Sequence, residues 1–205
     1  PLYESLKDAG AVYGDTFGWE RAKWYAPKGV EEEYGFRRNN SFDAVAQECR
    51  AVREAVGLTD LTSFAKYEVI GADAQPFLER VCANRVPAKI GGIVLSQMLT
   101  TLGGIESEAT VTCIAEGHYY LLSGAVAELH DFDWLAQHIE LGEDVTVRNV
   151  TDDYGVLVLS GPRSREVLSS LTDAGLGNED GFTWMSAKEI IVADIAVRAL
   201  RVSYV

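Results

Sequence analysis

The sequence of 205 residues is poor in basic charge and has no long hydrophobic run. Its 18 Lys and Arg face 31 Asp and Glu, which gives a formal net charge of −13. An acidic protein repels phosphate, which argues against general nucleic-acid binding but still allows a local anion site built from a few arginines. No apolar run approaches the ~18 residues that a membrane-spanning helix needs. We therefore expect no nucleic-acid partner and no membrane association.

Cysteine is scarce, and its spacing carries no metal or disulfide signature. The three cysteines, Cys49, Cys82 and Cys113, are odd in number and include no CxxC pair. They are predicted to be reduced, buried thiols, which suggests a cytoplasmic location. The histidines also lack the three- or four-residue spacing of a helical ligand pair, so we expect no metal site.

The common nucleotide and hydrolase motifs are missing. The chain contains no GxGxxG after a strand, no GxxxxGK[ST] and no GxSxG. The segment from Ser160 to Ser164 resembles a phosphate-binding helix start, but a tight turn from strand to helix is the simpler interpretation. With 47% hydrophobic and 24% charged residues, the composition is that of an ordinary globular protein.

Residues 1–40 are rich in aromatics interleaved with glycine, and we predict a long extended arm that is anchored by those aromatics. Residues 41–56 then have the apolar stripe of a helix, with Ser41 as a plausible N-cap. Further helices are predicted at 72–82, 125–139 and 162–171. Strands are predicted at 58–70, 93–102, 105–114, 118–123, 144–150, 155–159, 189–193 and 195–205.

This mixture of helices and antiparallel strand pairs lacks a steady βαβ rhythm and indicates an α+β fold. The sheets are expected to be mixed but largely antiparallel, with helices packed on them. We predict two regions, an aromatic arm with the first helix at residues 1–55 and the main domain at residues 56–205.

The Gly103-Gly104 turn leads into a strand that carries two glutamates near its start. Alternation places Glu106 and Glu108 on one side of this strand and Ala109, Val111 and Cys113 on the other. A solvated hairpin is one interpretation, because glutamate is a poor strand former. A carboxylate at the mouth of a cleft, suited to moving a proton, is the other. Spacing alone does not choose between them.

Several ordered blocks resemble one family. The blocks are Val56-Gly57-Leu58-Thr59-Asp60-Leu61-Thr62-Ser63-Phe64, Gly71-Ala72-Asp73-Ala74, Gly103-Gly104-Ile105 and Gly161-Pro162-Arg163-Ser164. Together they resemble the tetrahydrofolate-binding aminomethyltransferase family, which includes the T-protein of glycine cleavage. The segments at 9–24, 53–58 and 82–85 are more similar to the folate domain of dimethylglycine and sarcosine dehydrogenases.

This resemblance implies a function in one-carbon metabolism. In those dehydrogenases an FAD-binding domain oxidises an N-methyl amine to an iminium, and the folate domain transfers the one-carbon unit to tetrahydrofolate. The small-molecule amine and reduced folate are the implied partners, and the flavin domain is implied to lie upstream in the same polypeptide. The alternatives are a stand-alone aminomethyltransferase and a non-catalytic folate-binding or scaffold module.

The resemblance also implies the site residues. The family's key carboxylate, often Asp, is matched by Glu108, while Glu106 is expected to be a solvated neighbour. Phe64, Tyr120, Leu122 and Tyr204 are expected to line the folate site, with a plain core position as the alternative for the apolar wall. The strand at 201–205 matches one that continues into a Gly-Glu-x-Gly segment in the family. We therefore expect a chain that is incomplete at its C-terminus and that, alone, binds tetrahydrofolate weakly or not at all and is inactive.

Overall fold

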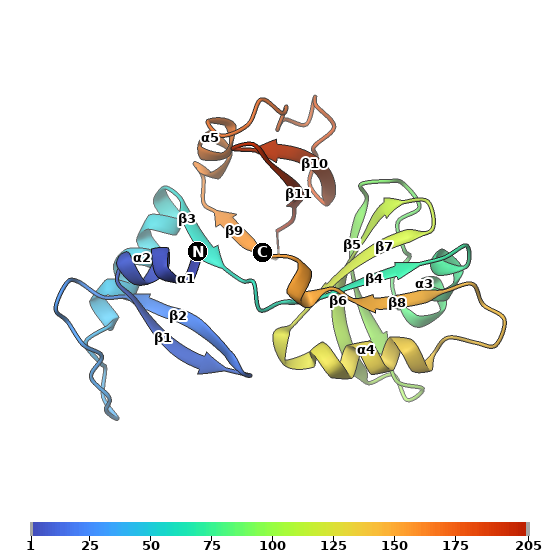
Figure 1. Ribbon diagram of the computed structural model, residues 1–205, viewed down its shortest axis with the longest axis horizontal. Coiled ribbons are helices and arrows are strands. Elements are labelled where there is room, and N and C mark those ends of the chain that lie inside the picture. The colour runs from blue at the N-terminus through green and yellow to red at the C-terminus, as the bar shows by residue number, and fades with distance from the viewer. Residues whose placement is uncertain (1, 204–205) are drawn as a thin grey trace. The chain divides into compact units, whose positions relative to one another are not determined.

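The structure is a computed structural model that describes residues 2–203 (Figure 1). The chain folds into two compact units. We call residues 1–62 with 156–167 the arm unit, and residues 63–155 with 168–205 the sheet unit. Residues 56–62 thus group with the arm. The expected division after residue 55 concerns functional domains and stays a prediction.

The arm unit contains regular structure where an irregular arm was expected. It comprises α1 (Leu2–Asp8), β1 (Ala11–Thr16), β2 (Trp19–Tyr25), α2 (Phe42–Glu54), β3 (Gly57–Asp60) and β9 (Leu157–Ser160). Strands β1 and β2 form an antiparallel hairpin, and β3 pairs antiparallel with β9. Phe17 and Gly18 close the hairpin with positive φ angles of 55° and 80°, the backbone that favours two-residue hairpin turns. The expectation of an extended arm was therefore wrong over residues 11–25.

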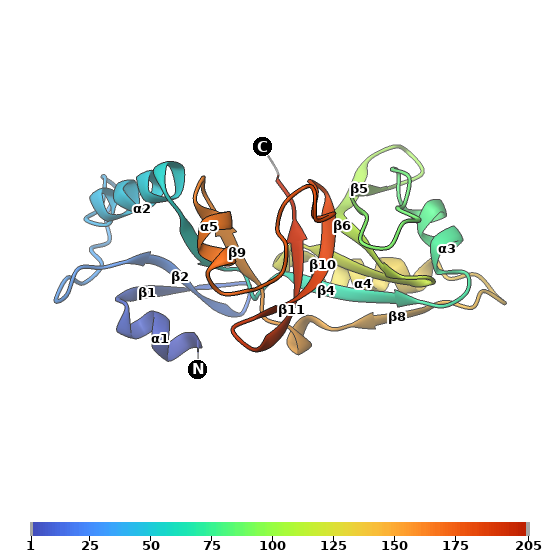
Figure 2. The same cartoon turned by 90° about the horizontal axis from the view of Figure 1, so that it is seen from above.

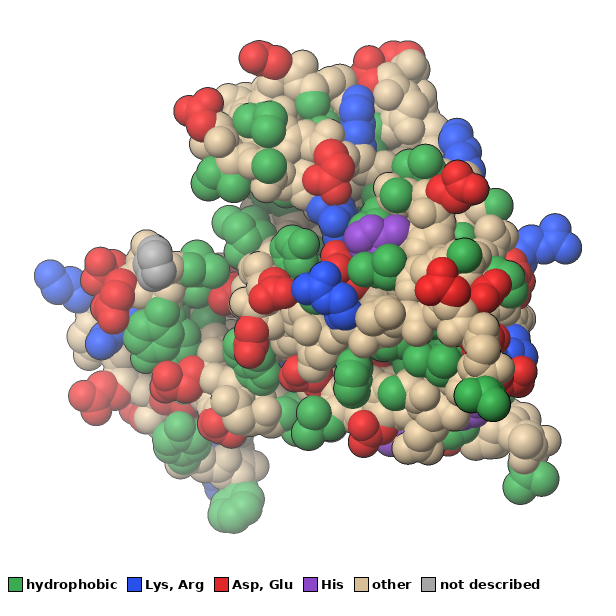
Figure 3. Space-filling model, turned by 45° about the vertical axis from the view of Figure 1, so that its right-hand side comes forward, with side chains coloured by type: hydrophobic (Ala, Val, Ile, Leu, Met, Phe, Trp, Pro, Cys, Tyr) green, Lys and Arg blue, Asp and Glu red, His purple; other side chains and the backbone are tan. Residues whose placement is uncertain are grey.

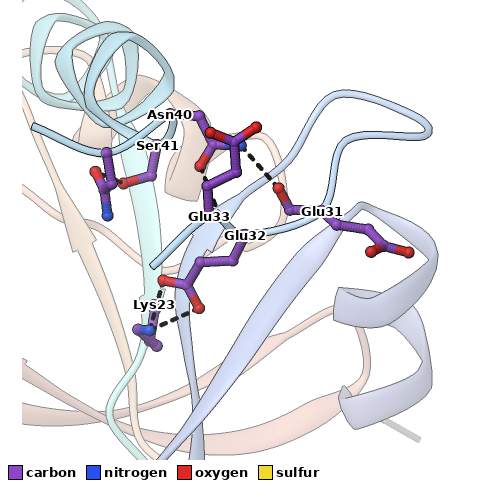
Figure 4. A network of polar contacts seen from close by, with 7 residues as sticks. Lys23, Glu31, Glu32, Glu33, Asn40 and Ser41 are labelled. Atoms are coloured by element: carbon purple, nitrogen blue, oxygen red, sulfur yellow. Dashed lines mark hydrogen bonds and ion pairs between the residues drawn. The ribbon is translucent and has the colours of Figure 1, made fainter. Parts of the chain in front are cut away.

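The segment between β2 and α2 is held mainly by polar contacts (Figure 4). Lys23 Nζ donates to both carboxylate oxygens of Glu32 at 2.6 and 2.8 Å. Asn40 donates through Nδ2 to the carbonyl of Glu31 at 2.7 Å. The aromatic side chains of Tyr34 and Phe36 are exposed, and the Tyr34 ring adds a contact to Lys23 Nζ, which lies 5.4 Å from its centroid.

Helix α2 forms where its apolar stripe predicts it, but two details differ. The hydroxyl of Ser41 makes no capping bond and donates instead to Asn39 Oδ1 at 2.7 Å. Cys49 is exposed, whereas Cys82 and Cys113 are buried as expected. Because α2 has no buried residue, its apolar stripe is only partly covered, and Cys49 lies on the uncovered part.

The sheet unit is built on a five-stranded antiparallel sheet of order β5-β6-β7-β4-β8. Its strands are β4 (Ala65–Ile70), β5 (Ile93–Leu99), β6 (Ile105–Ala115), β7 (His118–Ser123) and β8 (Thr146–Asn149). Helices α3 (Ala74–Val81) and α4 (Glu128–Gln137) bury apolar side chains such as Phe77 and Leu135 in one core with this sheet. In Figure 1, α4 lies along the sheet. This arrangement confirms the α+β prediction.

The remaining elements of the sheet unit lie outside the five-stranded sheet. They are η1 (Ala125–Ala127), η2 (Thr151–Asp153), β10 (Ser186–Val192) and β11 (Ile195–Arg201). Strands β10 and β11 form an antiparallel hairpin, drawn in red in Figure 2, with a small core of Leu176, Phe182 and Ile190. Helix α5 (Ser164–Ser169) is shorter than predicted and spans the boundary between the units along the chain.

One predicted strand is interrupted. Residues 58–70 form two strands, β3 and β4, rather than one. The Asp60 side chain accepts the backbone N–H of Thr62 through Oδ1 at 2.9 Å, which stabilises a turn after β3. Asp side chains commonly stabilise turns in this way, so the interruption has a local chemical cause.

Acidic side chains are prominent on the molecular face drawn in Figure 3, in keeping with the net charge. Within residues 2–203, no helix is both long and apolar enough to cross a membrane.

Candidate functional site

Strand pairing gathers polar residues on the sheet face opposite the core. Thr110 pairs with Leu122 and Leu122 with Lys66, while Tyr120 pairs with both Thr112 and Glu68. Since paired residues project to the same side, these side chains share one face, which we call the polar face. It carries the polar residues Lys66, Glu68, Gln97, Glu108, Thr110, Thr112, Tyr120 and Arg148, together with apolar ones such as Ile93, Leu95 and Leu122.

Glu108 lies near the start of β6 and is exposed. It pairs with Gln97 of β5, whose Nε2 donates to Glu108 Oε2 at 2.6 Å. This bond fixes the orientation of the carboxylate while leaving it accessible to a ligand. The exposure agrees with a solvated hairpin residue and equally with a proton acceptor at the open end of the polar face.

Glu106 does not share the environment of Glu108, contrary to the alternation predicted from sequence. A β-bulge lies between Met98 and Leu99, which pair with Ser107 and Ile105 and leave Glu106 as the extra residue. Such an extra residue breaks the alternation of side chains. The Glu106 carboxylate accordingly reaches His130 on α4, the helix on the core side of the sheet, at 2.8 Å.

The expected wall residues differ in burial. Tyr120 is buried, and burial raises the pKa of its phenol. Its ring meets that of Tyr154 edge-on, with ring centroids 6.0 Å apart. Phe64 and Leu122 are half-buried, so both retain surface that a ligand can cover. Tyr204 lies outside the described residues.

Two residues of this region carried no recognisable signal in the sequence. Lys66 is fully buried, and its Nζ donates to the carbonyls of Phe64 at 2.9 Å and Thr151 at 2.8 Å. Arg198 of β11 places its guanidinium carbon 4.5 Å from the ring centroid of Tyr120 and donates through Nε to Glu189 at 2.9 Å. The direction of the Lys66 side chain follows from alternation along β4. Arg198, in contrast, belongs to β11, which is distant in the sequence.

Among the buried polar atoms that lack a hydrogen-bond partner within residues 2–203 are Thr112 Oγ1 and Arg198 Nη1 of this region. Buried polar atoms are normally paired, so each unpaired one needs an explanation, and a polar ligand would be one. Within residues 2–203, no group of three or more His, Cys, Asp or Glu side chains is placed to hold a metal ion. The site thus provides a carboxylate, hydrogen-bonding groups and partly exposed apolar side chains for a ligand.

A hollow of about 570 Å³ lies elsewhere in the sheet unit, along β10, β11 and residues 171–174. None of the expected site residues lines it. The hollow therefore does not contain the candidate site, although its lining residue Glu189 accepts a hydrogen bond from Arg198.

Comparison with known proteins identifies relatives over nearly the whole chain. Residues 2–205 match the family described as the GCVT N-terminal domain. The chain is 38% identical to rat dimethylglycine dehydrogenase over 206 residues, which cover 99% of this chain and 24% of that protein. It is 28% identical to human sarcosine dehydrogenase, covering all of this chain and 27% of that protein. The chain therefore spans about a quarter of the length of these relatives.

The fold also matches a solved structure. The glycine cleavage aminomethyltransferase T of Bartonella henselae superimposes with a TM-score of 0.73 at 28% identity, over 92% of this chain and 46% of that one. This match confirms the expected aminomethyltransferase fold and shows that the chain covers only part of it. One expectation is contradicted. The dimethylglycine and sarcosine dehydrogenase relatives are mitochondrial by name, so the predicted cytoplasmic location was wrong.

Proposed function

Because the chain belongs to the GCVT N-terminal domain family, we propose that it is the folate-binding part of a dimethylglycine or sarcosine dehydrogenase-like enzyme. This part passes the one-carbon unit of an oxidised N-methyl amine to tetrahydrofolate. The observation that carries the proposal is the 38% identity to rat dimethylglycine dehydrogenase across 99% of the chain. The accessible Glu108 carboxylate, fixed by Gln97, supports the chemistry.

The residues of the polar face fit a flat ligand that loses a proton during the reaction. Reduced folate supplies a nucleophilic ring nitrogen that attacks the iminium carbon. Glu108 accepts the proton released from that nitrogen as the new C–N bond forms and the electron pair of the iminium C=N bond moves to the amine nitrogen, while Gln97 keeps the carboxylate in one orientation. The amine C–N bond then breaks, the demethylated amine leaves with a proton, and a second folate nitrogen bonds the carbon to give methylene-tetrahydrofolate. Phe64 and Leu122 provide half-buried apolar surface that excludes water and limits hydrolysis to free formaldehyde.

Tyr120 and Arg198 provide the more buried end of the same face. The unpaired Arg198 Nη1 and Thr112 Oγ1 offer hydrogen-bonding capacity toward a polar ligand. Oxidation of the amine is assigned to an FAD-binding domain in another part of the same polypeptide, and none of residues 2–203 is assigned to the flavin. The substrate of the whole enzyme is a small N-methyl amine.

The proposal is tested by Glu108→Gln in the full-length flavoprotein, with the product measured as methylene-tetrahydrofolate or as free formaldehyde. We expect amine oxidation to continue while transfer to folate falls about 10²- to 10⁴-fold, the usual effect of losing a general base. Glu116→Gln is the matched control, because Glu116 is an exposed glutamate at the β6–β7 turn of the same unit. Transfer that is equal in the two variants contradicts the assigned role and favours a non-catalytic scaffold.

A stand-alone aminomethyltransferase is the second candidate, favoured by the TM-score of 0.73 to the T-protein of Bartonella henselae. It would take an aminomethyl group from a carrier protein and need no flavin. Flavin absorbance in the purified full-length protein separates the two candidates. A protein without flavin that releases ammonia from an aminomethylated lipoyl carrier supports the second.

A further inference from the structure

A chain of three titratable side chains connects α4 to the start of β6, away from the polar face. His130 Nδ1 lies 3.1 Å from Asp131 Oδ1, and His130 Nε2 lies 2.8 Å from Glu106 Oε1. The Asp131 side chain is fully buried, while those of Glu106 and His130 are 25% and 48% exposed. The imidazole therefore bridges one buried and one partly exposed carboxylate.

The contact is made at the one irregular point of the β5–β6 pair. Glu106 is the residue left over at the bulge between the paired Leu99–Ile105 and Met98–Ser107. A bulge re-aims the side chains that follow it. Glu108 lies two residues after Glu106, and its side chain turns toward Gln97 directly after the bulge.

We propose that His130, bridging Glu106 and Asp131, is a positioning residue that holds the bulge of β6 and thereby the direction of Glu108. We call the three side chains the imidazole clamp. The inference rests on the proposed function, because it concerns delivery of the one-carbon unit by Glu108. His130 touches no reacting group and acts only through the backbone of β6.

The clamp depends on the protonation of His130. An imidazolium has two N–H donors and can serve both carboxylates, whereas a neutral imidazole has only one. Asp131 Oδ2 is buried without a hydrogen-bond partner among residues 2–203, so this desolvated carboxylate needs the single remaining donor more than Glu106 does. Glu106 is consequently released when His130 loses its proton.

The direction of the pH effect follows from the same contacts. Hydrogen bonds from the imidazolium to Asp131, and then to Glu106, raise the pKa of His130 above its ordinary value. A raised pKa means that the clamp is closed at low pH and opens as the pH rises through that value. The bulge is therefore held up to pH values somewhat above the range in which histidine ordinarily titrates.

The other polar groups near the clamp are held by contacts of their own. On α4 itself, the Glu128 carboxylate accepts Asn149 Nδ2 of β8 at 2.8 Å. From β4, the Tyr67 hydroxyl donates to the carbonyl of Glu128, and burial raises the pKa of Tyr67 far from neutrality. The η1 segment contributes only Ala125, Val126 and Ala127. The pH dependence of the clamp therefore rests on His130, whose pKa is raised by its two carboxylate partners.

Two substitutions at Glu106 test the clamp without exposing the buried Asp131. Glu106→Ala removes the contact to His130. Glu106→Gln preserves a hydrogen bond in both states, since its amide oxygen accepts from the imidazolium and its NH₂ donates to the neutral ring. Glu116→Ala is the matched control on the neighbouring turn.

The measurement is the rate of transfer to tetrahydrofolate by the full-length protein at saturating folate, across a pH series. We expect the wild-type rate to fall about tenfold as His130 deprotonates, the scale of one charged hydrogen bond. Glu106→Ala should show the low rate at every pH, whereas Glu106→Gln should keep the high rate at every pH. The KM for folate should change little, because the clamp does not touch the ligand.

Hydrogen exchange in the same proteins provides an independent readout. Peptides covering residues 103–110 should exchange faster in Glu106→Ala than in wild type at the same pH. Unchanged transfer and pH profile in Glu106→Ala overturn the clamp. If Glu108→Gln still reduces transfer in that case, the proposed function stands. If neither substitution has an effect, both proposals fail.

Discussion

The guanidinium of Arg198 lies over the ring of Tyr120, with its carbon 4.5 Å from the ring centroid, and joins β11 to the five-stranded sheet. Its Nε donates at the same time to Glu189 on the paired strand β10. A cation stacked on a tyrosine contributes about 0.5–2 kcal/mol, depending on how far it is desolvated. This contact stabilises the more buried end of the polar face, at Tyr120.

We predict that Arg198→Ala lowers the melting temperature of the transition that contains this domain by about 2–4 °C per kcal/mol lost. The loss combines the cation–π contact with the ion pair to Glu189. Differential scanning calorimetry of the full-length protein measures it. Arg85→Ala, at an exposed loop arginine, is the control. Equal shifts for the two variants contradict a stabilising role for Arg198.

Gly71 cannot accept a side chain without moving the backbone. Its φ is +145°, and a Cβ at this position would lie 1.9 Å from the carbonyl oxygen of Asp144. That carbonyl accepts the backbone N–H of Asp73 at 3.2 Å, so it is not free to move away. We expect Gly71→Ala to destabilise the protein by more than about 2 kcal/mol.

Gly124→Ala is the matched control, because Gly124 has a φ of −70° and no atom within 4 Å of a built Cβ. Its melting temperature should stay equal to wild type or rise slightly. Similar losses in the two variants would show that the approach of Gly71 to Asp144 is not as close as described.

The three cysteines should differ sharply in reactivity. Burial raises the pKa of Cys82 to about 11 and also raises the pKa of Cys113. Since the thiolate is the nucleophile, both thiols stay protonated and shielded at pH 8. Cys49 is exposed on α2. We expect iodoacetamide at pH 8 to alkylate Cys49 alone, as determined by peptide mass mapping of the native protein. Rapid labelling of Cys82 or Cys113 contradicts the described burial.

The sheet unit was predictable from sequence because its strands alternate regularly and are bounded by glycine turns. β7 matches its predicted range, His118–Ser123, and β5 and β6 form the expected hairpin. Alternation failed at Glu106, since a bulge adds one residue and no local pattern announces it. The orientation of the two glutamates is therefore a property of the pairing, not of β6 alone.

The arm unit was harder to predict. Its glycines and aromatics follow no period of two, yet β1 and β2 pair around Phe17 and Gly18. Cys49 lies on the apolar stripe of α2, and only the packing determines whether that stripe is covered. The position of Arg198 over Tyr120 could not be inferred either, because this contact joins residues 78 positions apart in the sequence.

The fate of the one-carbon unit in the full-length protein is the most direct test of the account. The protein would be supplied with an N-methyl amine labelled with ¹³C in the methyl group, with and without tetrahydrofolate, and the labelled products would be quantified. We predict labelled methylene-tetrahydrofolate in proportion to amine oxidised when folate is present, and free formaldehyde when it is absent. Formaldehyde in equal yield under both conditions would contradict a role for this chain in folate-dependent transfer.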